Sequence, residues 1–243
     1  MMFLFALLGC LVASSVTNIS AKRVYSEKDL RRHIFADYDK FVRPAAHPDS
    51  TITVSTGITP LSIRELDTKT QVLVMDTYML MKWNDDFLKW DPSEFNNITE
   101  LRLPNSLVWK PDLSVYTASR DDALFPTSPT NVIVDHNGSV LWVPYFTIKS
   151  RCPLKKQGKN YFECVIKIGS WTYSGKLLNP QLDTSEVDLS NFEDSNPSWK
   201  LVTIKSDRQS QFYPCCPGED YPAIHFNVTL KRRWPSVSME NEV

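Results

Sequence analysis

The chain of 243 residues contains little glycine and no excess of charge of either sign. Seven glycines stand against 16 prolines, which is too few for several glycine-rich phosphate-binding loops. Lys and Arg number 27 and Asp and Glu 28, so the formal net charge is −1. A nucleic-acid-binding domain is usually clearly basic, and anionic membranes attract polybasic segments. The composition therefore predicts that neither nucleic acid nor a membrane surface is a partner.

Common signatures of catalytic and metal sites are also missing. The sequence has no G-x-S-x-G motif, no H-E-x-x-H motif and no C-x-x-C motif, and its four histidines are scattered. Asp85-Asp86 and Asp121-Asp122 are adjacent pairs, and neighbours in an extended chain point to opposite sides, so adjacency does not build a carboxylate dyad. We therefore expect no enzyme, no metal site and no cofactor.

Residues 1–13 (MMFLFALLGCLVA) form the main apolar run. The run is shorter than the roughly 20 residues that span a bilayer, and small polar residues follow it, as in a secretory signal peptide, although the usual basic start is missing. We predict a signal peptide at 1–21, a binding domain at 22–233 and a polar tail at 234–243. Later apolar stretches are interrupted by charge or proline, so we expect a secreted, extracellular protein without membrane insertion; a membrane anchor is the alternative.

The cysteines agree with secretion. Cys10 lies in the apolar run, and an even set remains, which is typical of disulfides in secreted chains: Cys152, Cys164, Cys215 and Cys216. Adjacent Cα atoms are about 3.8 Å apart, whereas ordinary disulfides need about 4.4–6.8 Å. A bond between Cys215 and Cys216 would therefore be strained, and pairing of both with Cys152 and Cys164 stays open.

Glycosylation sequons point the same way. The candidates in the predicted domain are Asn97, Asn137 and Asn227, and a fourth, Asn18, falls in the predicted signal region.

One helix is expected near the start of the domain. Ser26 and Asp29 have the spacing of a capping box, and an apolar face runs through Leu30, Ile34, Tyr38 and Phe41. Arg43-Pro44 is expected to end it.

The rest of the chain favours strands. Twelve Phe, nine Tyr and seven Trp accompany many prolines and β-branched residues. Residues 71–83 and 223–231 alternate with period two, and Asn137-Gly138 between 131–135 and 139–146 predicts a hairpin. We therefore expect one all-β domain, a β-sandwich with an N-terminal helix.

Aromatic residues surround the adjacent cysteines. Phe212, Tyr213 and Tyr221 lie in a proline-rich, turn-like segment that lacks the periodicity of a core strand. Core packing is the ordinary role of such residues. Aromatics on a turn indicate instead a surface for a ligand or a partner.

Three segments resemble the agonist-binding segments of nicotinic acetylcholine receptors. Trp109-Lys110-Pro111-Asp112 with Tyr116 is similar to the first, residues 169–173 (GSWTY) to the second, and residues 212–222 (FYPCCPGEDYP) to the third. Cys152 and Cys164 stand where this Cys-loop receptor family has its signature loop. Within the family, the chain is most similar to the secreted, channel-free acetylcholine-binding proteins.

The resemblance implies a β-sandwich of about ten strands, a homopentamer and a site between subunits for acetylcholine or another small quaternary or tertiary amine. It implies the disulfides Cys152–Cys164 and Cys215–Cys216. The residues implied for the principal face are Tyr116, Trp171, Tyr213, Cys215, Cys216 and Tyr221. Those implied for the complementary face of the neighbouring subunit are Tyr78, Ile133, Leu141 and Val143.

Some residues depart from the family pattern. Tyr78 stands where the family usually has Trp, and Ala223 replaces an acidic residue, which puts a contact with Lys167 in doubt. The loop between Cys152 and Cys164 is slightly short. Three alternatives stay open: a truncated extracellular domain of a ligand-gated channel subunit, a secreted adhesion sandwich and, least favoured, a secreted hydrolase.

Overall fold

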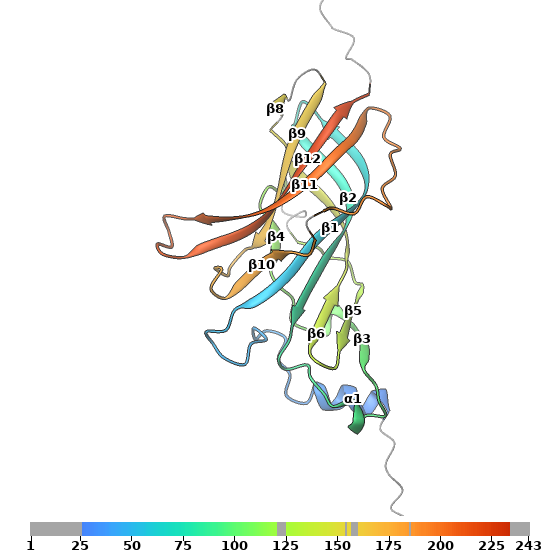
Figure 1. Ribbon diagram of the computed structural model, residues 1–243, viewed down its shortest axis with the longest axis vertical. Helices are drawn as coiled ribbons and strands as arrows, with labels where there is room; N and C mark the ends of the chain where they lie inside the picture. Colours follow the sequence, from blue (N-terminus) through green and yellow to red (C-terminus); the bar gives the residue numbers. More distant parts are fainter. Residues whose placement is uncertain (1–25, 121–124, 154, 157–159, 185, 234–243) are drawn as a thin grey trace, which may run out of the picture.

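Two β-sheets pack face to face along the long axis of the molecule, with one short helix at the end where the described chain begins (Figure 1). The computed structural model describes residues 26–120, 125–153, 155–156, 160–184 and 186–233. The expected signal peptide, the expected tail, Asn18 and Asp121-Asp122 lie outside these residues.

The described residues form one α-helix, two 3-10 turns and twelve strands. In chain order they are α1 (Glu27–Ile34), β1 (Ile52–Asp67), β2 (Val72–Asn84), η1 (Pro92–Glu94), β3 (Glu100–Pro104), η2 (Asn105–Leu107), β4 (Leu113–Val115), β5 (Asn131–Asp135), β6 (Ser139–Trp142), β7 (Tyr145–Arg151), β8 (Lys155–Lys156), β9 (Tyr161–Ser170), β10 (Leu178–Leu182), β11 (Trp199–Phe212) and β12 (Asp220–Arg232). The prediction of an all-β sandwich with an N-terminal helix is confirmed.

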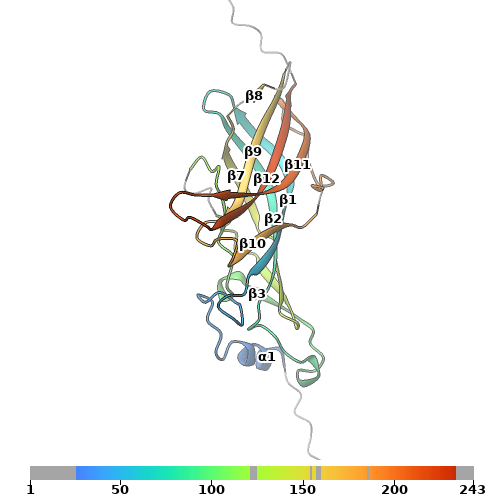
Figure 2. The same ribbon diagram turned by 60° about the vertical axis from the view of Figure 1, so that its left-hand side comes forward.

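The first sheet has the order β10-β1-β2-β6-β5-β3. Strand β7 lies on the same side of β2 as β6: β7 pairs with the first half of β2, and β6 pairs with its last residues. The second sheet has the order β11-β12-β9-β4, with β8 beside β9. The β1–β10 pair is parallel and the other named pairs are antiparallel. Figure 2 shows that the tip of β11 and β12 projects from the body of the sandwich.

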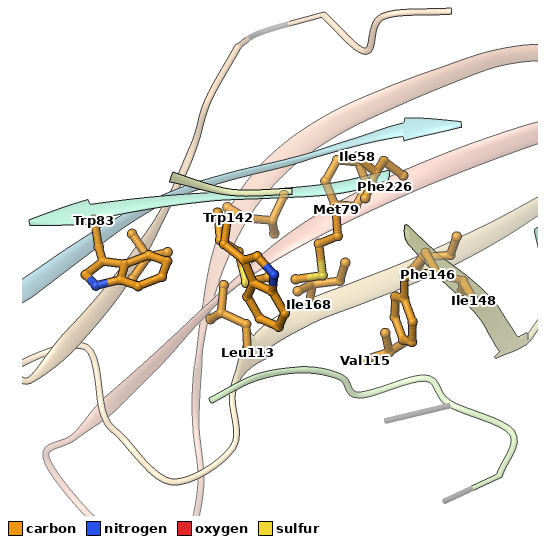
Figure 3. Close-up of a cluster of buried hydrophobic side chains, with 14 of the residues drawn as sticks. Ile58, Met79, Trp83, Leu113, Val115, Trp142, Phe146, Ile148, Ile168 and Phe226 are labelled. Carbon is orange, nitrogen blue, oxygen red and sulfur yellow. The ribbon is translucent and has the colours of Figure 1, made fainter. Parts of the chain in front are cut away.

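The core lies between the inward faces of the two sheets. Met79, Trp142 and Phe146 come from the first sheet, and Ile168 and Phe226 from the second (Figure 3). The alternation predicted for 71–83 and 223–231 is confirmed, because every second residue of these segments is buried. Burial of the alternate apolar side chains fixes the strand register, since a one-residue slip would expose them all.

The hairpin at Asn137-Gly138 is confirmed. Gly138 has a φ of +89°, a left-handed conformation that favours glycine, and its N–H donates to the Asp135 carbonyl at 2.8 Å. The strand expected over 139–146 is divided in two: β6 ends at Trp142 and β7 begins at Tyr145. Pro144 lies in the gap and has no N–H for a ladder hydrogen bond.

The expected end of the helix is wrong, although its capping box is confirmed: the helix ends at Ile34, not near Arg43. The Tyr38 hydroxyl donates to Asp85 at 2.7 Å and accepts from the Trp109 N–H at 2.8 Å, which holds it in tertiary contacts outside the helix. Asp39 accepts from the Phe41 N–H at 2.9 Å, an Asx turn that competes with helix. Phe41 is 84% exposed instead of lying on a buried face.

Cys152 and Cys164 are joined by a disulfide and are both buried. It links the end of β7 to β9, and so connects the two sheets. None of the helices in the described part of the chain is both long enough and apolar enough to cross a membrane.

Candidate functional site

A hollow of about 490 Å³ lies where the projecting tip of β11 and β12 meets the ends of β4 and β9. Tyr116 follows β4, Trp171 follows β9, and the turn after β11 supplies Tyr213 and the cysteines. The residues that line the hollow are Tyr116, Trp171, Tyr213, Cys215, Cys216 and Tyr221. These are the residues that sequence reasoning assigned to the principal face, brought together from the three chain segments of the resemblance.

Two edge-to-face pairs shape the aromatic walls. The Tyr116 and Trp171 ring centroids are 6.1 Å apart with an interplanar angle of 66°, and those of Tyr213 and Tyr221 are 5.5 Å apart at 70°. Trp171 remains 56% exposed, so it is not a core residue. More than half of its surface is therefore accessible to a ligand.

Asp112 organises the loop that carries Trp171. One carboxylate oxygen accepts from the Ser170 hydroxyl at 2.5 Å, and the other accepts from the N–H and hydroxyl of Thr172 at 2.8 and 2.7 Å. The Trp171 N–H donates to the Asp112 carbonyl at 3.1 Å. Sequence reasoning placed Asp112 in a motif but assigned it no role; the structure shows that it positions the loop around Trp171.

Tyr116 is held from two sides. Its N–H donates to the Lys167 carbonyl at 2.8 Å, and its hydroxyl donates to the Ser170 carbonyl. Gly169 lies close to the hydroxyl end of Tyr116: a Cβ there would come within 2.8 Å of the Tyr116 hydroxyl oxygen and 3.0 Å of the Pro222 carbonyl oxygen. Tyr116 can thus pack closely against β9 and β12 only because Gly169 has no side chain.

Gly169→Ala should consequently lower the free energy of unfolding by roughly 1–3 kcal/mol, the usual cost of forcing extra atoms into a packed place. Thermal and denaturant unfolding would measure it. The matched control is Gly57→Ala in β1, where the nearest atom to an added Cβ is the Asp183 Cβ at 3.7 Å, an ordinary contact. Equal losses in the two variants would contradict the close-packing role of Gly169.

Tyr116 and Tyr221 of the hollow stay neutral near physiological pH. Burial, and to a lesser extent the nearby Tyr213 and Asp112, raise the pKa of Tyr116 above its ordinary value. The hydrogen bond with the Cys216 thiol raises the pKa of Tyr221 to about 12. None of the six residues that line the hollow is a carboxylate, so it offers a cation aromatic faces and neutral oxygens.

The adjacent cysteines lie in the turn between β11 and β12 and line the hollow. Their sulfur atoms are 2.7 Å apart and the structure has both as thiols, so the vicinal disulfide stays a prediction. Because Cys152 and Cys164 are bonded to each other, the structure contradicts the alternative in which they pair with Cys215 and Cys216.

The residues predicted for the complementary face lie in the other sheet. Tyr78 is on β2, Ile133 on β5 and Leu141 on β6, with Val143 directly after β6. Ile133 is the register partner of Leu141. All four are partly or largely exposed. One chain therefore carries both sets of residues but does not bring them into one hollow.

Comparison with known proteins agrees with this geometry. Residues 27–234 match the family model of the neurotransmitter-gated ion-channel ligand-binding domain. The chain belongs to this family. Since the family is that of ligand-gated channels, the prediction that the chain is not an enzyme is confirmed.

The family's nicotinic acetylcholine receptor subunits include clear relatives of this chain. It is 31% identical over 232 residues to the acetylcholine receptor subunit alpha-L1 of Schistocerca gregaria, and the aligned region covers 90% of this chain and 40% of the relative. It is 36% identical over 231 residues to the acetylcholine receptor subunit alpha-type acr-16 of Caenorhabditis elegans, with 93% of this chain and 45% of the relative aligned. It is 32% identical over 207 residues to the human neuronal acetylcholine receptor subunit alpha-10, with 84% of this chain and 45% of the relative aligned. The chain thus spans less than half the length of these relatives.

The structure shows the surroundings of Ala223 and Lys167, the two residues whose contact the sequence put in doubt. Ala223 is buried opposite Gly169, and the β12 partner of Lys167 is His225. Burial, and then the charge of Lys167, hold the pKa of His225 below its ordinary value. Lys167 therefore faces the neutral imidazole of His225 across the strands, while Ala223, which stands where the family usually has an acid, pairs with Gly169.

The three sequons of the domain differ in their surroundings. Asn97 and Asn137 are exposed, whereas Asn227 is half-buried and its Nδ2 donates to Asp207 at 2.9 Å. Glycosylation at each of them stays a prediction.

Proposed function

We propose that this chain is a secreted protein that binds acetylcholine and related quaternary or tertiary amines at the subunit interfaces of a homopentamer. One observation supports it above all: four aromatic residues and the adjacent cysteines line a single hollow in which the Trp171 ring is exposed. The receptor names of the relatives support the ligand class. The apolar run of residues 1–13, the even set of cysteines and the sequons support secretion.

The chemistry of the hollow suits a quaternary ammonium. Such a cation cannot donate hydrogen bonds through its methyl groups, and aromatic faces attract it by their negative quadrupole potential. Each face contributes ~0.5–1 kcal/mol when exposed and about 2 kcal/mol or more when dry. Four rings can together supply a large part of the roughly 8 kcal/mol that a micromolar affinity requires.

A second subunit would complete the site around the hollow. In the proposed assembly the neighbour presents the outward face of its first sheet, with Tyr78, Ile133, Leu141 and Val143. The projecting tip of β11 and β12 would cover the cation from the principal side. Exclusion of water would strengthen each cation–π contact.

Titration with acetylcholine, followed by tryptophan fluorescence, tests the proposal. We expect saturable quenching or enhancement, because the exposed Trp171 ring would pass from water into contact with the ligand. Native mass measurement of the product collected from the culture medium should give five chains. A folded monomer that binds acetylcholine at full strength, or a pentamer that does not bind it, would contradict the proposal.

A second candidate is the extracellular domain of a channel subunit. The relatives are receptor subunits, and the chain spans less than half of their length. A longer transcript that continues into membrane-spanning helices would decide for this candidate. The aromatic site would then serve the same ligand class in a membrane-bound assembly.

A further inference from the structure

Tyr145, a residue that neither the motifs nor the resemblance singled out, lies beside Tyr78 on the outward face of the first sheet. The two are register partners on β7 and β2. Their ring centroids are 6.2 Å apart with an interplanar angle of 78°, an edge-to-face pair. Tyr145 is 39% exposed and Tyr78 is 40% exposed, so both rings present surface to the solvent.

Tyr145 is held in place by an anchor of polar side chains. The Arg64 Nη2 donates to the Tyr145 hydroxyl at 3.1 Å, while the Arg64 Nε forms an ion pair with Asp76. Asp76 is only 7% exposed and also accepts from the Thr147 hydroxyl at 2.7 Å. A tyrosine whose hydroxyl is hydrogen-bonded and whose ring packs edge-to-face on another ring loses little conformational entropy when a ligand binds to it.

The anchor adds no net charge to this surface. Burial alone would raise the pKa of Asp76, but hydrogen bonds from Thr147, Arg64 and Tyr145 outweigh it and hold the pKa below its ordinary value. Asp76 is therefore ionised at neutral pH and balances the guanidinium of Arg64. A cation that approaches Tyr145 meets a neutral pair behind the ring instead of an unpaired positive charge.

We infer that Tyr145 is a specificity-determining residue of the complementary face, where it and Tyr78 form a two-ring wall that favours elongated cations over compact ones. The inference rests on the proposed function. In the proposed function, the four aromatic residues that line the hollow would surround one cationic group of the ligand. A ligand with a second cationic group at the end of an apolar chain can also reach the extra ring of Tyr145. A compact ligand has no group left to place there.

The test compares acetylcholine with decamethonium, a long bis-quaternary ammonium, by titration of the full chain. Tyr145→Ala should weaken decamethonium by about three- to thirtyfold, the factor that one cation–π contact is worth, and acetylcholine by less than about twofold. Tyr145→Leu should give the same selective loss, because it keeps apolar bulk on the strand and removes the aromatic face. Tyr145→Phe should weaken decamethonium less than Tyr145→Leu does, because it keeps the ring and loses only the hydrogen bonds of the hydroxyl.

The matched control is Tyr161→Leu in β9 of the other sheet, where the tyrosine ring lies under Lys231 at 5.4 Å. It should change neither affinity. If the unmodified protein binds both ligands and Tyr145→Leu weakens them equally or not at all, the inference is wrong and the proposed function stands. If the unmodified protein binds neither ligand, the proposed function is wrong and the inference falls with it.

Discussion

Trp171→Ala should weaken acetylcholine binding by about ten- to a hundredfold, or about 1.4–2.7 kcal/mol, and leave the fold intact. Trp offers a cation the best aromatic face of any side chain, and Trp171 has 56% of its surface exposed in the hollow. Because the ring is outside the core, its loss creates no buried cavity. Titration calorimetry would measure the affinity, and melting with native mass would verify folding and assembly.

A graded variant and a buried tryptophan serve as controls for this prediction. Trp171→Phe keeps a smaller ring face and should lose less affinity than Trp171→Ala. Trp109→Ala should instead destabilise the domain by roughly 3–5 kcal/mol, because Trp109 is buried and packs edge-to-face on Trp83 at 6.0 Å. If folded, pentameric Trp171→Ala binds acetylcholine normally, Trp171 does not belong to the site.

The paired change Cys152→Ala and Cys164→Ala should lower the free energy of unfolding by about 3 kcal/mol. The disulfide joins residues separated by 12 positions, and its removal frees the unfolded chain between them. Both cysteines are buried, so the variant also loses packed sulfur atoms from the core. Denaturant titration under non-reducing conditions would measure the change.

The paired change Cys215→Ala and Cys216→Ala is the matched control. It removes the same atoms from a projecting turn, where Cys215 is exposed and Cys216 half-buried. We expect its unfolding free energy to stay within about 0.5 kcal/mol of the unmodified protein, as for surface substitutions. Its acetylcholine affinity should fall, because the two residues line the hollow. Equal stability of the two paired variants would contradict a structural role for the Cys152–Cys164 bond.

Local pattern predicted the strands well because it depends on near neighbours in the chain. The alternation in 223–231 and the Asn137-Gly138 turn each report a conformation that a few residues determine. The helix shows the limit of such reasoning. Its start is set by Ser26 and Asp29, three residues apart, but its end depends on Asp85 and Trp109, which hold Tyr38 from far along the chain.

For the candidate site, too, the sequence indicated some features and only the structure showed the others. The motifs around Tyr116, Trp171 and Tyr213 indicated the residues of the principal face through their resemblance to a known family. The resemblance did not indicate the contacts that support these residues. These are the hydrogen bond that Asp112 accepts from Thr172 and the space that Gly169 leaves for Tyr116. Tyr145 had no signal in the sequence, because its importance depends on a neighbour 67 positions away and on the strand pairing that makes them partners.

By itself, the sequence determined the sandwich class, the capping box, the hairpin turn and the types of residue available to bind a cation. These follow from periodicity, backbone propensity and side-chain chemistry, which act over a few residues. Only the tertiary structure decided which aromatics share one hollow, that Cys152 pairs with Cys164, and that Tyr78 and Tyr145 lie together on the opposite sheet. Those contacts join distant segments, and they are selected by burial of the whole core and by the register of paired strands, which no short stretch of the chain contains.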